Sequence, residues 1–382
     1  MQSLAMPASR YIFGTLPWYS VTMVSAIIVA LFLAQREEKR RGLPKDTVID
    51  LALWLIPCGI IGARLYYVAF TWDLFRENPL AILQIWKGGL AIYGGLLGGL
   101  AAAAVFAWRR KLNLLTLVDM IVPGLALAQC IGRWGNYFNM EAYGLPITDP
   151  AWQFFPFGVL IPEAGGTVWH LAAFFYESLW DFGVFLALRA LRKPCRRPGD
   201  LSAWYVLLYG AGRLIVEGLR MDSLMTSSGS VRISQLLSVL GCLAVFLLLC
   251  FHALKTMPRK NWWVGLLTTL AGTVLAALLP HPADAFWGYR PVFCLHLGLV
   301  AGGIAALMMQ RPGRQLLRML PAALALASEA VLSIVFAGHA FTSGLATAQC
   351  ALFSLCLIAA CAGMFPFGLS SASSAESSPA AD

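Results

Sequence analysis

Residues 114–144 read LLTLVDMIVPGLALAQCIGRWGNYFNMEAYG. The first part, residues 114–133, is almost wholly apolar and has the length of about 20 residues that a helix needs to cross a bilayer. The second part is polar, with Arg133, Asn136 and Asn139 at three-residue intervals and Glu141 close behind. This pattern predicts a membrane-spanning helix that ends in a functional site. A simple helix cap with interfacial anchors is the alternative interpretation.

The composition of the whole chain agrees with a membrane protein. Of 382 residues, 59% are hydrophobic and only 12% are charged, against about 25% charged residues in ordinary soluble domains. This excludes a disordered chain, a fibrous chain and a water-soluble enzyme. The net charge of +9 is compatible with nucleic-acid binding or with basic cytoplasmic loops, and the placement of the charges decides between them.

Apolar segments of membrane-spanning length recur along the chain, and clusters of Lys and Arg follow every odd-numbered segment. By the positive-inside rule, the N-terminus is outside, the C-terminus is cytoplasmic, and no nucleic-acid partner is needed to explain the charge. The Ser- and Ala-rich tail, residues 370–382, is expected to be disordered. The eleven predicted spans are residues 18–34, 48–70, 88–108, 114–133, 174–191, 201–218, 233–251, 262–279, 292–310, 319–337 and 345–367.

The sixth span carries a polar stripe. Tyr209, Arg213 and Glu217 recur every four residues, and Arg220 follows three residues later, so one helix face presents all four side chains. A guanidinium oriented by Glu217 matches a phosphate with two parallel hydrogen bonds. The stripe therefore predicts an anion site, with a self-neutralised row of ion pairs between helices as the alternative.

The fifth span contains Glu177 within FFYESLWD. A carboxylate at this depth is costly unless it is paired. The cationic residues inside other spans, and hence its candidate partners, are Arg64, Arg133 and Arg213.

The third span begins in WKGGLAIYGGLLGG, residues 86–99. Gly94 and Gly98, like Gly95 and Gly99, are four residues apart, which is typical of tight helix packing. Tyr93 projects from among these glycines, where its hydroxyl can reach a ligand. The stretch lacks the Lys-Ser/Thr sequel of a P-loop.

No metal or cofactor is expected, because the five histidines show no ligand spacing. The serine-nucleophile motif GxSxG is also absent. The chemistry is therefore expected to use a nucleophile that the substrate supplies.

At these residues the chain resembles the bacterial prolipoprotein diacylglyceryl transferases. The matching stretches are IWKGGLAIYGGLLGG, GRWGNYFNMEAYG, FYESLWD, YGAGRLIVEGLRMDS and RISQLLSV. The matches run in family order from about residue 18 to about residue 251. The resemblance implies a seven-helix core in the bacterial inner membrane whose active site faces the outer leaflet. It also implies transfer of diacylglycerol from phosphatidylglycerol to the thiol of a lipobox cysteine in a prolipoprotein signal peptide, with release of glycerol phosphate.

The resemblance and the residue analysis together nominate the site. The candidate catalytic residues are Arg133, Arg213 and Tyr93. The candidate substrate-binding residues are Asn136, Glu141, Gly144, Tyr19, Tyr209, Glu217, Arg220, Glu177 and Arg64. Tyr93 stands where many family members have histidine, and His170 lies one residue too far from Glu177 to inherit a family role.

The expected organisation is an all-helical polytopic membrane protein in two parts. Residues 1–256 form the transferase core, within which residues 135–169 form a long outer-face loop region. Residues 257–369 form an extra module of about four spans without a recognised motif, in which Glu329 and His339 are assigned packing or interface roles. Two rival functions remain: a lipid or anion transporter using the same Arg-lined cavity, and an inactive lipoprotein-binding relative.

Overall fold

The computed structural model describes residues 5–7, 9–193, 195, 197–222, 232–235, 237–238, 240–242, 244–245 and 248. The extra module, with Glu329 and His339, and the tail at residues 370–382 lie outside the described residues. The chain divides into two compact units. The first contains the described parts of Met1–Met23, Gln129–Arg196 and Ala203–Asp382, and the second contains Val24–Ala128 and Arg197–Ser202.

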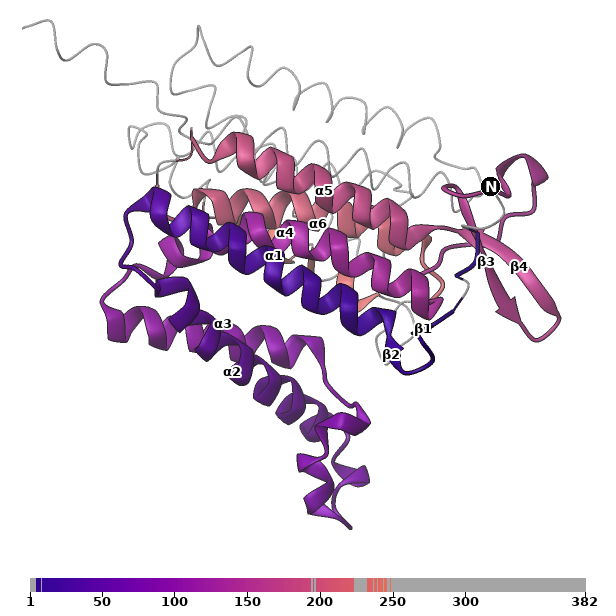
Figure 1. Ribbon diagram of the computed structural model, residues 1–382, viewed down its shortest axis with the longest axis horizontal. Helices are drawn as coiled ribbons and strands as arrows, with labels where there is room; N and C mark the ends of the chain where they lie inside the picture. Colours follow the sequence, from indigo (N-terminus) through magenta and orange to yellow (C-terminus); the bar gives the residue numbers. More distant parts are fainter. Residues whose placement is uncertain are drawn as a thin grey trace, which may run out of the picture. The chain divides into compact units, whose positions relative to one another are not determined.

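The first six predicted spans are helices, which makes the described part of the chain mostly helical (Figure 1). They are α1 (Trp18–Arg41), α2 (Thr47–Phe70), α3 (Ile92–Arg110), α4 (Leu114–Asn139), α5 (Ala173–Leu191) and α6 (Asp200–Leu219). A shorter apolar helix, Ile233–Cys242, begins where the seventh span was predicted.

Four of the described helices, α1 to α4, are long and apolar enough to cross a membrane. They also expose large apolar side chains, such as Ile28 and Phe32 on α1 and Leu53 and Leu65 on α2. Such surfaces suit contact with lipid, where an apolar face needs no covering partner. The helices α5 and α6 have comparable lengths but carry the charged residues of the candidate site. The protein is therefore a polytopic membrane protein.

In the second unit, α2 and α3 lie side by side (Figure 1). Their glycines face one another, because a Cβ atom on Gly94 would collide with the Gly62 carbonyl oxygen and one on Gly98 with the Cys58 carbonyl oxygen. The predicted use of these glycines for close helix packing is confirmed. Three short 3-10 helices, η2 (Trp72–Leu74), η3 (Pro79–Leu83) and η4 (Ile85–Lys87), join the two helices.

Two buried carboxylates hold helix starts in the second unit. Glu38 accepts hydrogen bonds from the backbone N–H groups of Asp46 and Val48 at the start of α2. Asp119 of α4 accepts from the backbone N–H groups of Gly199 and Ser202 at the start of α6. Each carboxylate satisfies donors that have no partner within their own helix.

The first unit adds β-structure that the all-helical prediction lacked. β1 (Tyr11–Ile12) pairs with β2 (Leu16–Pro17), and β3 (Gly158–Glu163) pairs with β4 (Gly166–Leu171) in antiparallel register. The β3–β4 hairpin, which Figure 1 shows joined to the start of α5, begins within the predicted loop region at residues 135–169 and extends two residues beyond it. A further short helix, η5 (Pro150–Trp152), precedes it. The hairpin packs on the end of α4 through a cluster containing Tyr137, Ala142, Val159, Ile161, Ala172 and Phe174.

Candidate functional site

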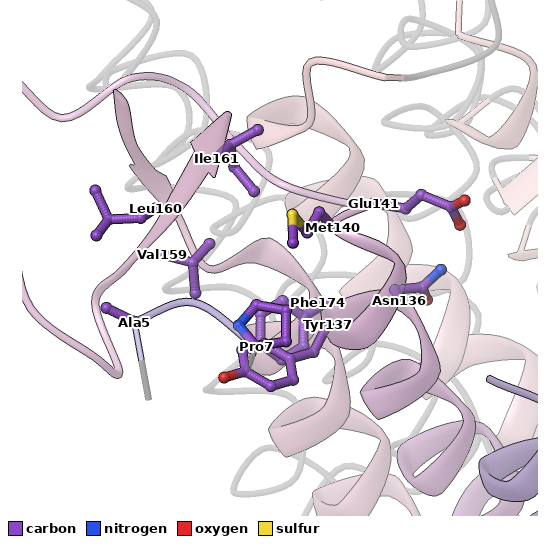
Figure 2. Close-up of a pocket in the computed structure, with 10 residues that line it drawn as sticks. All are labelled: Ala5, Pro7, Asn136, Tyr137, Met140, Glu141, Val159, Leu160, Ile161 and Phe174. Atoms are coloured by element: carbon purple, nitrogen blue, oxygen red, sulfur yellow. The ribbon is translucent and has the colours of Figure 1, made fainter. Parts of the chain in front are cut away.

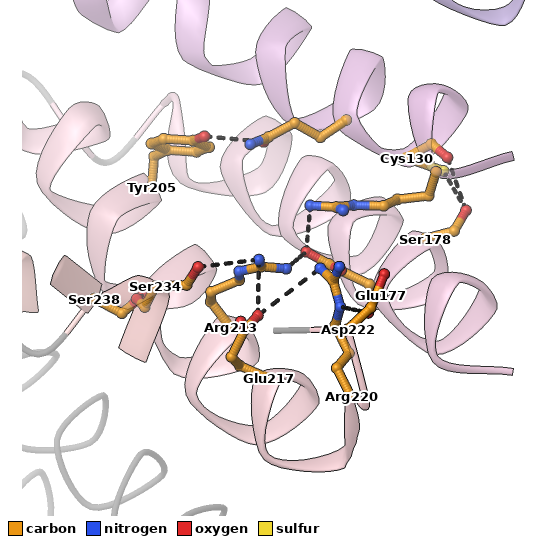
Figure 3. Close-up of polar contacts among 12 residues, drawn as sticks. Cys130, Glu177, Ser178, Tyr205, Arg213, Glu217, Arg220, Asp222, Ser234 and Ser238 are labelled. Carbon is orange, nitrogen blue, oxygen red and sulfur yellow. Dashed lines mark hydrogen bonds and ion pairs between the residues drawn. The ribbon is translucent and has the colours of Figure 1, made fainter. Parts of the chain in front are cut away.

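Glu177 lies at the centre of a buried ion-pair cluster in the first unit. Its Oε1 atom is 2.5 Å from Nη2 of Arg133 and 2.7 Å from Nη1 of Arg213. Its side chain is only 2% exposed. One carboxylate oxygen on α5 thus joins a guanidinium of α4 to a guanidinium of α6 (Figure 3). Two of the three predicted partners of Glu177 are confirmed.

The polar stripe of α6 continues this cluster outward. Nη2 of Arg213 is 2.7 Å from Oε2 of Glu217, which is 3.9 Å from Nη1 of Arg220. Arg220 in turn donates through Nε to Asp222 at 3.0 Å. Ser234 adds a longer contact, 3.3 Å from Nη2 of Arg213. The predicted face of the sixth span is therefore a continuous row of alternating charges, shown in Figure 3.

Asp222 ties this row to the chain that follows α4. Its Oδ2 atom accepts a hydrogen bond of 2.8 Å from the backbone N–H of Ala142. Burial alone would raise the pKa of Asp222, but hydrogen bonds from Arg220 and from the Ala142 N–H outweigh burial and lower the pKa below its usual value. Asp222 is thus held as a carboxylate at neutral pH.

Two stacked tyrosines lie one and two turns before Arg213 on α6. The rings of Tyr205 and Tyr209 are 5.5 Å apart and nearly parallel. The Tyr205 hydroxyl donates to Oε1 of Gln129 on α4 at 2.9 Å. Tyr209, a predicted site residue, is close enough to Glu177 to interact with it electrostatically. The tyrosines therefore extend the polar interior by two helical turns.

Asp181 is a buried carboxylate one helical turn beyond Glu177 on α5. It is 1% exposed, and among the described residues neither of its side-chain oxygens has a hydrogen-bond partner. It interacts electrostatically with Glu177, Arg133 and Arg213. A buried carboxylate without a hydrogen-bond partner lowers the stability of the folded protein. We therefore expect Asp181 to destabilise this part of the first unit.

The chain after α4 turns sharply around Glu141. Met140 and Ala142, on either side of it, both have left-handed backbone angles, with φ of 57°. Such conformations in non-glycine residues are strained and concentrate at functional sites. Glu141 itself is exposed and forms a 3.8 Å ion pair with Arg10, which also donates to Oδ1 of Asn139 at 3.0 Å.

Asn136 and Glu141 share a small pocket with apolar residues of the β3 strand and the N-terminal segment (Figure 2). Its volume is about 10 Å³, which is room for about one water molecule. This pocket is too small for a phospholipid headgroup. Its lining residues are Ala5, Pro7, Asn136, Tyr137, Met140, Glu141, Val159, Leu160, Ile161 and Phe174.

Gly144 joins three segments by backbone contacts. Its N–H donates to the Leu171 carbonyl oxygen at 2.8 Å, and it forms an isolated antiparallel bridge with Arg220. A Cβ atom at Gly144 would lie 2.8 Å from Cβ of Leu171, so only glycine fits. The Gly144 carbonyl contacts Nδ1 of His170 at 2.8 Å, and Nε2 of His170 contacts Glu163. His170 thus links Glu163 of β3 to the Gly144 backbone.

Tyr19 lies against the α4 end of the site. A Cβ atom at Gly135 would lie 2.8 Å from both the Tyr19 ring and the Thr22 hydroxyl oxygen. The glycine between Arg133 and Asn136 therefore leaves the space that the Tyr19 ring occupies. This brings the predicted residue of the first span to the GRWGN segment.

Tyr93 and Arg64 belong to the second unit. Tyr93 is the second residue of α3 and is half-buried. Arg64 is buried on α2, and its guanidinium donates to backbone carbonyls of η3 and of the Gly88-Gly89 turn before α3. The candidate site residues therefore fall into two groups. Tyr93 and Arg64 belong to the second unit, and the group around Arg133 and Arg213 belongs to the first.

Sequence reasoning missed several polar residues of this group. Asp181 follows Glu177 by four residues, and Tyr205 precedes Tyr209 by four, so helical spacing alone was sufficient to find both. The residues missed are Arg10, Gln129, Asp181, Tyr205, Asp222 and Ser234. In the described part of the chain, no group of His, Cys, Asp and Glu side chains is arranged to hold a metal ion.

The chain is similar in sequence to a group of known bacterial proteins. A family model described as prolipoprotein diacylglyceryl transferase matches residues 9–251. Similar proteins named phosphatidylglycerol–prolipoprotein diacylglyceryl transferase occur in several bacteria. The protein from Thermosynechococcus vestitus is 43% identical over 232 residues, which are 60% of this chain and 85% of that protein. The protein from Limosilactobacillus reuteri is 43% identical over 249 residues, 64% of this chain and 90% of the relative.

A third relative, from Halalkalibacterium halodurans, is 38% identical over 255 residues, covering 65% of this chain and 86% of its own length. The matched region contains every candidate site residue, from Tyr19 to Arg220. The chain belongs to the prolipoprotein diacylglyceryl transferase family.

Proposed function

We propose that this membrane protein transfers the diacylglyceryl group of phosphatidylglycerol to the cysteine thiol of prolipoproteins. The acceptor is the lipobox cysteine of a signal peptide, and the products are a thioether-linked lipid and glycerol phosphate. In this proposal the enzyme is integral to the bacterial inner membrane, with its N-terminus outside and its site open to the outer leaflet. Residues 1–256 form the catalytic core, and residues 257–369 form an additional membrane module that ends on the cytoplasmic side.

The observation that carries the proposal is the pair of guanidinium groups on Glu177. Among the described residues, Arg133 has one ion pair, with Glu177, so most of its N–H groups are available to a ligand. Arg213 is held by Glu177 and Glu217 and is 13% exposed. Two oriented guanidinium groups, each with N–H groups to spare, suit the phosphodiester of a phospholipid.

The chemistry follows from the substrate. The thiol sulfur attacks the glycerol carbon that carries the phosphate, a carbon–sulfur bond forms, and the carbon–oxygen bond to phosphate breaks. The electron pair leaves on the phosphate oxygen, and the thiol proton ends on the released glycerol phosphate. Charge grows on the phosphate oxygens during this step, so Arg133 and Arg213 stabilise the transition state more than the ground state.

The neighbouring residues have supporting roles in this scheme. Glu177 and Glu217 fix the orientation of the guanidinium groups, and nearby cations favour the thiolate form of the incoming cysteine. Asn136 binds headgroup hydroxyls or orients Arg133, and Tyr93 positions the headgroup or relays the thiol proton. The remaining proposed substrate contacts come from Tyr19, Glu141, Gly144, Tyr209 and Arg220.

The rival functions have less support. The family model and the similar proteins are named as transferases and not as transporters. An inactive scaffold has no need for Arg133 to keep N–H groups free. The comparisons therefore favour the transferase.

The test is transfer of labelled diacylglycerol from phosphatidylglycerol to a lipobox peptide by the purified full-length protein. Arg133→Ala and Arg213→Ala should each lower kcat by about 100-fold or more, the usual effect of losing one donor to a developing oxyanion. Arg189→Gln is the matched control, because Arg189 lies at the other end of α5 and contacts the Phe185 ring. The scheme is wrong if both alanine variants keep near-normal transfer.

A further inference from the structure

Arg64 of α2 is a buried cation whose whole guanidinium is engaged by one loop. It is 7% exposed, and all three of its nitrogens donate to backbone carbonyl oxygens. These are the carbonyls of Ile82 (2.8 Å from Nε), Gly88 (2.8 Å from Nη1), Gly89 (2.9 Å from Nη1) and Ala81 (2.8 Å from Nη2). The side chain is therefore saturated by protein groups and has little capacity left for a phosphate.

The aromatic rings of Phe75 and Tyr67 also lie close to this guanidinium. Its central carbon lies 5.1 Å from the centre of the Phe75 ring and 5.9 Å from that of Tyr67. Both distances are within the range of cation–π attraction. Arg64 thus holds one defined position between α2 and the segment that leads to α3.

The segment is shaped to receive Arg64. Gly88 and Gly89 have φ angles of 87° and 74°, a region that disfavours any other residue. A Cβ atom on Gly89 would lie 2.5 Å from Nη1 of Arg64 and 2.7 Å from the Tyr67 ring. The two glycines are required both for the turn and for the close approach of the guanidinium.

This turn fixes the start of α3. The Ala91 N–H donates to the carbonyl oxygen of Ala63, the residue before Arg64, at 3.0 Å. Tyr93 follows two residues later, and Gly94 after it packs directly on Gly62 of α2. The backbone of Tyr93 is therefore held on both sides by α2.

The Tyr93 hydroxyl differs from its well-held backbone. Among the described residues, no hydrogen bond to this hydroxyl is present, and the side chain is half-buried. The well-held backbone gives this hydroxyl a defined starting position on a rigid element, as a group that acts on a ligand requires.

We propose that Arg64 is a positioning residue that acts through Tyr93: by anchoring the turn at residues 88–91, it sets where the Tyr93 hydroxyl meets the bound phospholipid. This inference rests on the proposed function, and it replaces direct substrate binding by Arg64. A displacement of a reacting group by about 1 Å can cost about 100-fold in rate. Loss of the anchor should therefore lower kcat far more than it changes KM for phosphatidylglycerol.

A double-mutant cycle on the full-length enzyme tests this mechanism. Tyr93→Phe should lower kcat by about 100-fold, within the usual effect of losing a proton-transfer group, and Arg64→Gln by about 10- to 100-fold. In the Tyr93→Phe background, Arg64→Gln should have less than about a twofold further effect, because coupled residues are not additive. Arg76→Gln is the matched control: Arg76 lies in the same segment, but its side chain is 63% exposed and its ion pair with Asp73 is 3.6 Å long.

Three results would overturn the inference: full activity in Tyr93→Phe, full activity in Arg64→Gln, or equal losses from Arg64→Gln in both backgrounds. Amide hydrogen exchange provides a readout independent of activity. Arg64→Gln should accelerate exchange at residues 88–95 while Arg76→Gln does not, and unchanged exchange in Arg64→Gln contradicts the anchor. An inactive wild-type protein that keeps this exchange pattern would count against the proposed function but not against the anchor.

Discussion

Replacing Glu177 by Gln removes the charge that holds two buried guanidinium groups together. Oε1 of Glu177 lies 2.5 Å from Arg133 and 2.7 Å from Arg213. Without this carboxylate, two cations face each other in a region of low dielectric constant. Breaking a buried ion pair by removing one partner costs about 3–5 kcal/mol. We therefore expect Glu177→Gln to be among the most destabilising single substitutions in the protein.

The second step of this prediction uses Arg133, because among the described residues its one ion pair is with Glu177. In the double variant Glu177→Gln/Arg133→Gln, one cation leaves with the carboxylate, while Arg213 keeps its contact with Glu217. The double variant should lose about 1–3 kcal/mol less than the sum of the two single variants, as expected for contacting residues.

The measurement is thermal unfolding of the full-length protein in detergent, followed by Trp fluorescence. A loss of 3 kcal/mol corresponds to a fall in Tm of roughly 6 °C or more for a domain of this size class. The reasoning is refuted if Glu177→Gln melts within about 1 °C of wild type, or if the single-variant losses add to within about 0.5 kcal/mol.

Two further predictions concern carboxylates in the first unit. Asp181→Leu should stabilise the protein by about 1–3 kcal/mol, since it removes a buried group without a partner among the described residues; a lower Tm would show that Asp181 has a stabilising partner. The pKa of Asp222 is lowered in the folded state, so its stabilising contribution is complete above the ordinary carboxyl pKa of about 3.9 and is lost as the pH falls through the lower folded-state pKa. Lowering the pH from about 5 to about 2 should therefore reduce the free energy of unfolding more in wild type than in Asp222→Asn. An equal reduction in the two proteins would contradict the pairing of Asp222 with Arg220.

Much of the helical fold could be predicted from the sequence because apolar length is a local property. The first six spans agree with α1 to α6, but their ends do not. The predicted fourth span stopped at Arg133, where the apolar run ends in a charge, whereas α4 continues to Asn139. Arg133 is paired with Glu177 inside the protein, so the end of the apolar run need not be the end of the helix. The predicted third span began at Gly88, but the positive φ angles of Gly88 and Gly89 delay the helix to Ile92.

The β3–β4 hairpin shows a different limit. Its signal was present, because β-branched and aromatic residues occur in the strands on either side of the Ala164-Gly165 turn. A search for apolar segments of membrane-spanning length does not detect six-residue strands. The candidate site was easier to predict, since helical spacing placed Arg213 and Glu217 on one face. The contacts of Arg64 could not be predicted from the sequence, because its four partners are backbone carbonyl oxygens, which every residue type has.

The ion-pair cluster also constrains how the protein is assembled in the bilayer. A single Arg or Asp near the centre of an inserting helix costs about 2.5–3.5 kcal/mol, and both α5 and α6 carry such residues. The contact of Arg213 with Glu177, together with the hydrogen bond from Trp180 Nε1 to the Leu208 carbonyl oxygen, offsets these costs only when the two helices are adjacent. During membrane insertion, neither α5 nor α6 is expected to move readily into the lipid without the other helix. We therefore expect α5 and α6 to enter the lipid together, because the contacts between them form only when the two helices are adjacent.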